Sequence, residues 1–231
     1  ERITRLEKIM EMRNAVPQMR HLSQYLQSTT GFRIKPVHGI LSQRDFLNAL
    51  AHRVFCSTQY IRHPATRDYT EEPDILHEIV GHISMLGDPV IANLTQEIGL
   101  LSLGATDRQI AELGSIYWFT VEFGAVRDGK GFRSYGAGVA GSVGELKHFI
   151  SDKARFAPLD PSKNIHETFV IQAMQHEYKY CNTIEDAFKE LQTFGRLLEK
   201  KATMAYDPKT QTIVTDREVR GSFKGHAGLF F

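Results

Sequence analysis

Two histidines at an unusual spacing restrict most strongly how this chain can fold. Residues 73–82 (PDILHEIVGH) place His77, Glu78 and His82 within six residues. On a regular α-helix, five steps separate two side chains by roughly 140°, so a regular helix cannot aim both imidazoles at one ion. If they bind a metal together, the helix must end, loosen or bulge near Gly81. Otherwise the segment is an amphipathic helix with one buried and one exposed histidine.

A third metal ligand would have to come from elsewhere, and Glu122 is the best candidate. It lies in residues 115–124 (SIYWFTVEFG), among apolar and aromatic neighbours. A carboxylate is costly to bury there unless it is paired or binds a metal, so the alternatives are a buried ion pair or a surface-facing position. With the two histidines it would form a 2-His-1-carboxylate set, which leaves metal positions open for the oxygen chemistry of non-haem Fe(II).

A zinc hydrolase is the second enzymatic interpretation of these residues. Glu78 would then act as a general base beside His77 and His82. The spacing of five residues disfavours it, because the zincin motif H-E-x-x-H has a spacing of four.

Periodicity and capping residues predict a mainly helical (α+β) protein with a few short strands. Apolar spacing or an N-cap residue predicts helices over residues 3–10 and after Ser42, Asp88, Asp107, Ser142 and Thr183. Strands are predicted over residues 32–37, with Pro36 arguing for an edge, and over residues 210–214, after a turn at Asp207.

Composition excludes several classes of protein. With 231 residues, 42% hydrophobic and 24% charged, the chain is long and apolar enough for one large domain or at most two small ones. A net charge of +1 gives no overall field to attract nucleic acid or an anionic membrane. No apolar run is long enough to cross a membrane, and two cysteines suggest reduced thiols, so a cytoplasmic protein is predicted.

Seven motifs, in order and with compatible spacing, resemble the catalytic domain of the biopterin-dependent aromatic amino acid hydroxylases, most closely the phenylalanine-hydroxylating members. They are GFRIKPV (31–37), LSQRDFL (41–47), TQYIRH (58–63), PDILHEIVGH (73–82), QEIGLLSLGA (96–105), IYWFTVEFG (116–124) and YGAG (135–138). The resemblance implies an iron and pterin domain over residues 31–216, preceded by a helical segment (1–30) and followed by an unstructured tail (217–231). It also implies Fe(II), tetrahydrobiopterin, O2 and an aromatic amino acid as the bound groups.

The resemblance further implies the roles of individual residues. The metal ligands would be His77, His82 and Glu122, and the pterin would contact Leu41, Tyr117, Glu78 and Phe46, the last by stacking. Arg62 would hold the substrate carboxylate and Asp74 would orient that arginine. The amino-acid pocket would be lined by Thr70, Pro73, Trp118, Phe123, Tyr135 and Ser142. Without the resemblance, Phe46 and Trp118 would be assigned to the core, and Arg62 and Asp74 to a surface ion pair of little weight.

The chain departs from the family at positions that bear on function. Gly141 stands where phenylalanine-type members carry a serine that supports an iron-ligand histidine, and Cys56 replaces a variable residue near the site. Ile171 is apolar as in phenylalanine-type members, and with Trp118 it favours phenylalanine over tyrosine or tryptophan. The helix with which animal members tetramerise has no counterpart, so the oligomeric state stays open. Gly141 also leaves open a non-catalytic relative that keeps the fold.

Overall fold

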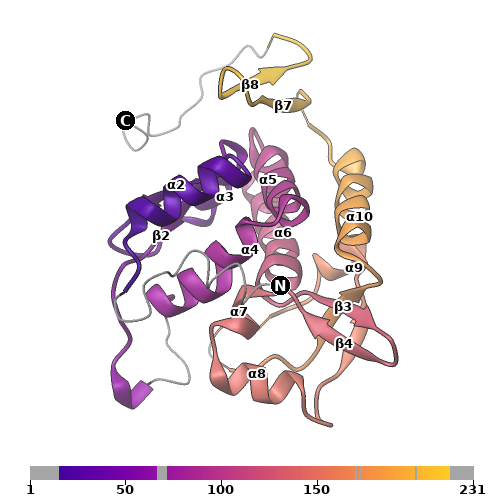
Figure 1. Cartoon of the computed structure of the whole chain (residues 1–231). Helices are drawn as coiled ribbons and strands as arrows, with labels where there is room; N and C mark the ends of the chain where they lie inside the picture. The colour runs from indigo at the N-terminus through magenta and orange to yellow at the C-terminus, as the bar shows by residue number, and fades with distance from the viewer. Residues whose placement is uncertain (1–15, 67–71, 170, 172, 201, 219–231) are drawn as a thin grey trace.

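Helices dominate the chain, as the periodicity predicts (Figure 1). The computed structural model describes residues 16–66, 72–169, 171, 173–200 and 202–218, so the helix predicted over residues 3–10 lies outside the described residues. The helices are α2 (Met19–Thr29), α3 (Gln43–Ala51), a 3₁₀ turn η1 (Pro64–Thr66), η2 (His77–Ile83), α4 (Ser84–Leu86), α5 (Pro89–Ser102), α6 (Asp107–Tyr117), η3 (Trp118–Glu122), α7 (Ala137–Ala140), α8 (Val143–Phe149), α9 (Pro161–Asn164) and α10 (Ile184–Leu197).

The predicted capping residues set most helix starts. Side chains that accept a backbone N–H of the following first turn are Ser42 (α3), Asp88 (α5), Ser142 (α8) and Thr183 (α10). The cap predicted at Asp107 is wrong by one residue. Thr106 is the N-cap of α6, because its hydroxyl accepts from the backbone of Gln109 while the Gln109 side chain accepts from the backbone of Thr106.

Short strands form three small sheets. The strands are β1 (Arg33–Pro36), β2 (Val54–Ser57), β3 (Ala125–Asp128), β4 (Gly131–Ser134), β5 (Phe156–Pro158), β6 (Tyr178–Cys181), β7 (Met204–Asp207) and β8 (Thr212–Thr215). β1 and β2 pair in parallel, a second sheet has the order β4-β3-β6-β5, and β7 and β8 form an antiparallel hairpin. The strand predicted over residues 32–37 is confirmed. The strand predicted from residue 210 begins only at Thr212, because the turn extends through Gln211, which has a positive φ of 56°.

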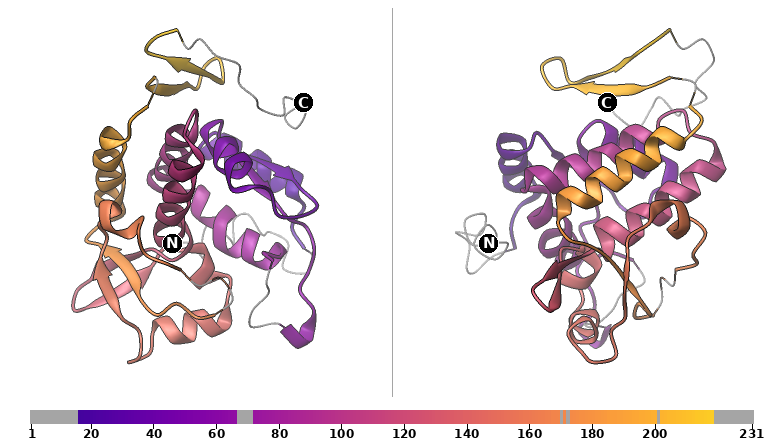
Figure 2. Two further views of the ribbon diagram at one scale, coloured as in Figure 1. Left: turned by 180° about the vertical axis from the view of Figure 1, so that it is seen from behind. Right: turned by 90° about the vertical axis from the view of Figure 1, so that its right-hand side faces the viewer.

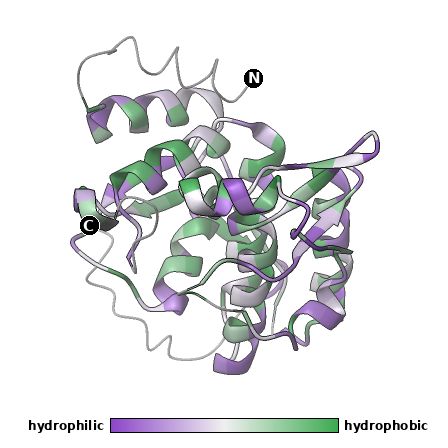
Figure 3. Cartoon of the chain, turned by 90° about the horizontal axis from the view of Figure 1, so that it is seen from below, coloured by the Kyte–Doolittle hydropathy of each residue, from purple (hydrophilic) through white to green (hydrophobic). Residues whose placement is uncertain are grey.

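The core is built around α5. This helix packs against α3, α6 and α10, which surround it in Figures 1 and 2. Leu94 and Ile98 on α5 are fully buried, together with Leu50 on α3 and Leu113 on α6. Figure 3 shows hydrophobic residues on the packed helices and hydrophilic residues toward the outside. The hairpin β7–β8 lies beyond the end of α10. In the part of the chain that the structure describes, no helix has the length and apolar character needed to span a membrane.

Candidate metal centre and its pocket

The two histidines lie on a π-helix, which resolves their spacing. At the end of η2 the backbone N–H of Ser84 donates to the carbonyl of Ile79, five residues earlier. In a π-helix the hydrogen bonds join residues five apart, so residues at that spacing come onto one face. The Nε2 atoms of His77 and His82 accordingly lie 3.0 Å apart. The helix therefore loosens as predicted, and the alternative with one buried and one exposed histidine is wrong.

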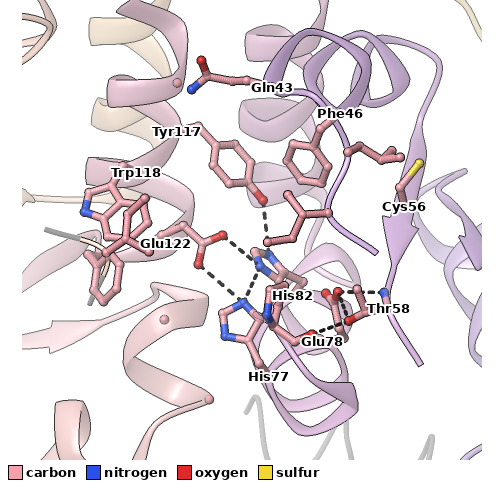
Figure 4. Close-up of a pocket in the computed structure, with 18 of the residues that line it drawn as sticks. Gln43, Phe46, Cys56, Thr58, His77, Glu78, His82, Tyr117, Trp118 and Glu122 are labelled. Atoms are coloured by element: carbon pink, nitrogen blue, oxygen red, sulfur yellow. Dashed lines mark hydrogen bonds and ion pairs between the residues drawn. The ribbon is translucent and has the colours of Figure 1, made fainter. Parts of the chain in front are cut away.

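Glu122 comes from a second π-helix and completes the cluster (Figure 4). At the end of η3 the N–H of Phe123 donates to the carbonyl of Trp118, again five residues earlier. Glu122 Oε1 lies 3.0 Å from Nε2 of His82, and Oε2 lies 3.6 Å from Nε2 of His77. The predicted convergence of the three side chains is confirmed, and together they could hold a metal ion.

The distances between the donor atoms suit one ion. Two ligand atoms, each about 2.1 Å from a metal and at right angles around it, are about 3.0 Å apart. Two of the three donor pairs have this separation and the third is slightly longer. The set therefore fits three adjacent positions around a first-row transition metal, with the other positions facing away from the three protein ligands.

The surroundings of His77 and Glu122 favour the protonation states in which these side chains bind a metal. Burial lowers the pKa of His77 to about 4, although the negative charge of Glu122 opposes the shift. The imidazole is thus neutral near pH 7, the form that binds a metal. Burial alone would raise the pKa of Glu122, but the nearby His82 and His77 outweigh this effect and lower it. The carboxylate is therefore ionised.

Glu78 lies on the same π-helix but is not part of the donor cluster. Its Oε1 accepts hydrogen bonds from the backbone N–H and the hydroxyl of Thr58, each at 3.0 Å (Figure 4). Burial raises the pKa of Glu78 to about 7, opposed by His82 and by the bonds from Thr58. This carboxyl can therefore exchange a proton near neutral pH, beside the donor cluster.

Arg62 and Asp74 form a buried pair, so the surface ion pair that the residues alone suggest is wrong. The guanidinium donates to both carboxylate oxygens, from Nε at 2.9 Å and from Nη2 at 2.6 Å. Asp74 also accepts from the backbone N–H of His77 at 3.1 Å, at the start of η2. Such a bidentate pair fixes the plane of the guanidinium. Asp74 thereby links Arg62 to His77, the first residue of η2 and one of the three donors.

The short helix α7 packs directly against both π-helices. A Cβ added at Gly136 would lie 2.2 Å from the carbonyl oxygen of Glu122, and one added at Gly141 would lie 2.8 Å from Cα of His77. Neither position has room for a side chain without movement of its neighbours. The carbonyl of Gly141 also accepts from Nη2 of Arg62 at 3.1 Å. A side chain at position 141 would therefore meet the backbone and the imidazole of His77.

A pocket of about 400 Å³ contains the donor cluster. The predicted site residues that line it are Leu41, Phe46, Arg62, Pro73, His77, Glu78, His82, Tyr117, Trp118, Glu122, Phe123 and Ser142. Asp74 is buried behind Arg62, and Tyr135 is buried next to Gly124 and is not among the described lining residues. Thr70 lies outside the described residues. Cys56 and Ile171 line the pocket as well.

Other lining residues were not predicted as site residues. They include Gln43, Thr58, Glu145, Phe169 and Ala173. Gln43 and Thr58 lie within two of the resembling motifs, which could have pointed to them. Nothing in the local sequence distinguishes Glu145 or Phe169, because long-range packing brings both to the pocket.

Aromatic side chains form two walls of the pocket. Phe46 packs edge-on against Tyr117, with ring centroids 5.3 Å apart and planes at 88°, and against Phe55. Burial keeps the pKa of Tyr117 well above its usual value, so its hydroxyl stays protonated, 3.4 Å from Nδ1 of His82. On the other side Trp118 stacks on Phe169, with centroids 4.6 Å apart. A flat ligand could enter from either side of the donor cluster.

Comparison with known proteins gives one consistent family. Residues 1–221 match the family model described as biopterin-dependent aromatic amino acid hydroxylase. The chain is 46% identical over 198 residues to the phenylalanine-4-hydroxylase of Dictyostelium discoideum, covering 86% of this chain and 45% of that protein. It is 44% identical over 198 residues to the enzyme of that name from Homo sapiens, covering 86% and 44%. The chain thus spans less than half the length of these curated relatives.

Solved structures show the same fold. The phenylalanine hydroxylase of Legionella pneumophila superposes with a TM-score of 0.76 at 28% identity, covering 86% of this chain and 89% of that one. The Chromobacterium violaceum enzyme with bound iron(III) and 7,8-dihydrobiopterin gives a TM-score of 0.78 at 29% identity, covering 85% and 73%.

Proposed function

This chain belongs to the family of biopterin-dependent aromatic amino acid hydroxylases, and on that basis we propose that it hydroxylates the ring of L-phenylalanine to give L-tyrosine. One observation carries the proposal. The His77, His82 and Glu122 donors face the same pocket as the Arg62 guanidinium and two aromatic walls. A metal, an amino-acid carboxylate and an aromatic ring can therefore be bound beside one another.

We propose Fe(II) as the metal, held by His77, His82 and Glu122. Two imidazoles and one carboxylate suit ferrous iron, and the spacing of the donors supports adjacent positions on one side of the ion. Bound iron and tetrahydrobiopterin together would supply the reduction of O2 that ring hydroxylation requires. The protein's contribution is to bind these groups, orient them and keep water away from them.

The pterin is proposed to lie on the side of Phe46 and Tyr117. Phe46 presents a partly buried ring to the pocket and Leu41 lies on the same rim. Because the pKa of Glu78 is raised to about 7 by burial, that side chain can accept or donate a proton close to the donor cluster. An aromatic ring, an apolar side chain and a carboxyl that can exchange a proton together support a pterin site on this side of the pocket.

The amino acid is proposed to lie on the side of Arg62 and Trp118. Asp74 holds the guanidinium in one plane, so Arg62 presents a fixed cationic edge for the substrate carboxylate. Trp118, Phe123 and Pro73 supply apolar walls for the ring. Ile171 adds an apolar side chain rather than a hydrogen-bond partner for the ring hydroxyl of tyrosine, which favours phenylalanine over tyrosine. No direct contact is proposed for Tyr135.

Anaerobic loading with Fe(II), followed by oxygen-dependent turnover of phenylalanine, tyrosine and tryptophan in parallel, tests the proposal. Tyrosine should form from phenylalanine, and only with both Fe(II) and the reduced pterin. His77→Ala should abolish this activity. His21→Ala, at an exposed histidine on α2, is the matched control and should keep it.

Three results would contradict the proposal. Preferred turnover of tyrosine or tryptophan would change the substrate within the family. Stoichiometric zinc with peptidase activity and no oxygen uptake would favour the hydrolase. A folded protein that binds iron but hydroxylates none of the three amino acids would favour a non-catalytic relative.

A further inference from the structure

The chain's single tryptophan is held by one loop from two directions. The indole N–H of Trp118 donates to Oε1 of Gln175 at 2.9 Å. The face of the same indole stacks on Phe169, with ring planes at 20°. Gln175 and Phe169 both belong to the segment between α9 and β6. This segment therefore controls both the edge and the face of the ring that forms one wall of the pocket.

Gln175 is itself tightly anchored. Only 5% of it is exposed. Its backbone N–H donates to Oε1 of the buried Glu145 at 3.1 Å, and its carbonyl lies 3.0 Å from Nε2 of His148. Its side-chain Nε2 donates to the carbonyl of Ala173 at 3.4 Å, which leaves Oε1 facing the indole. Contacts with α8 and with Ala173 thus hold the Gln175 oxygen that accepts from Trp118 in place.

The position of Trp118 matters because of where it lies on η3. Trp118 is the first residue of this π-helix and Glu122 is the last. The indole wall and the carboxylate donor are therefore parts of one rigid turn. A rotation of the indole about its side-chain bonds would change the distance between that wall and the metal donors without moving the donors.

We propose that Gln175 is a positioning residue that acts through Trp118 to set the width of the amino-acid side of the pocket. The identity of the amino acid rests on the proposed function. Gln175 does not line the pocket itself. Without its oxygen the partly buried indole N–H loses its acceptor, and leaving a donor unpaired in such a position is unfavourable. The indole then turns away, and the substrate ring loses a wall that is correctly spaced from the metal.

Kinetics can separate this role from a purely structural one. Gln175→Met keeps the length of the side chain and removes the acceptor. It should raise KM for phenylalanine about five- to tenfold while kcat changes by less than about twofold. Gln192→Met, a glutamine on α10 outside the pocket, is the matched control and should leave both constants unchanged.

A double-mutant cycle shows whether the effect passes through the indole. Trp118→Phe removes the N–H donor, so Gln175→Met in that background should change KM by less than about twofold. An equal effect in both backgrounds would mean that Gln175 merely holds the loop, and the proposal would be wrong. If the methionine variant does not fold, Gln175→Asn withdraws the oxygen by one methylene and carries the same test.

Fluorescence provides a readout that does not need turnover. Because Trp118 is the only tryptophan, all emission excited at long wavelength comes from this indole. Loss of the hydrogen bond and rotation of the indole in Gln175→Met should shift the emission maximum, and phenylalanine titrated into the Co²⁺-loaded protein should bind more weakly. Unchanged emission would overturn the proposal. If the wild-type protein neither binds nor hydroxylates phenylalanine, the proposed function fails, while the emission still decides whether Gln175 holds the indole.

Discussion

Gly141 offers the sharpest test of how the metal donors are positioned. Its backbone has φ −86° and ψ −2°, which alanine adopts as easily as glycine. Gly141→Ala therefore introduces no backbone strain, and any effect comes from the added methyl group. That carbon would lie 2.8 Å from Cα of His77 and 2.9 Å from its Nδ1.

The size of the effect follows from these distances. Carbon atoms in contact are normally about 3.5 Å apart or more, so the methyl group must push His77 or α7 away by roughly 0.7 Å. Metal–ligand distances tolerate only about 0.2 Å. The dissociation constant for Co²⁺ or Fe²⁺ should therefore rise about 10–100-fold, the range typical for residues that support a ligand. The overpacking should cost about 1–3 kcal/mol of stability as well.

Competition with a chelator measures the affinity, and the visible absorption of Co²⁺ reports the ligand arrangement. The control is Gly131→Ala, where the nearest atom would be an ordinary 3.8 Å from the new carbon. It should bind the metal like the wild-type protein. A folded Gly141→Ala protein with unchanged affinity and an unchanged Co²⁺ spectrum would refute the idea that close packing of α7 places His77.

Three further predictions follow from the pocket. Burial raises the folded-state pKa of Glu78 from 4.5 to about 7, so the metal-free protein loses stability as pH rises through that interval. As pH rises from 4.5 to 7, the free energy of unfolding of Glu78→Gln should therefore increase relative to that of the wild type by up to roughly 3 kcal/mol. A difference in unfolding free energy between the two proteins that does not change with pH in denaturant unfolding would contradict this. Arg62→Lys loses the two-point bond to Asp74 and should raise KM for phenylalanine about 10–100-fold; an unchanged KM would exclude Arg62 from carboxylate binding. Burial raises the pKa of Cys56 to about 11 and that of Cys181 to about 12, so iodoacetamide at pH 8 should label the native thiols at least about 100-fold more slowly than the unfolded ones, as mass spectrometry can follow.

The spacing of the histidines predicted a helical irregularity, because helix geometry alone excludes two imidazoles on one face at five residues. It did not distinguish an ended helix from a widened one, since that depends on which backbone carbonyl each N–H reaches. The apolar surroundings of Glu122 made it the best candidate for the third ligand, the resemblance implied the same residue, and the distances between the side chains now support that choice. Local geometry was thus predictable wherever one turn of chain determined it.

Contacts between segments far apart in the chain could not be predicted from the sequence pattern. Trp118 and Gln175 are 57 residues apart, and no periodicity links an indole to a remote amide. The burial of Arg62 and Asp74 likewise depends on how η2 and the chain beside β2 pack together. At Thr106 the difference was small: both Thr106 and Asp107 are good capping residues, and only the reciprocal bond with Gln109 decides between them.

The widened turn of η2 has a consequence for how the metal site can change during evolution. A π-turn contains one more residue than the α-helical turn it replaces. Deleting one residue between Glu78 and His82 would restore an α-helical register and create the H-E-x-x-H spacing of zinc peptidases. Substitutions cannot make that change, because they leave the number of residues the same. The π-helical spacing of the two histidines therefore depends on the number of residues between them, and the loss of a single codon there would remove it.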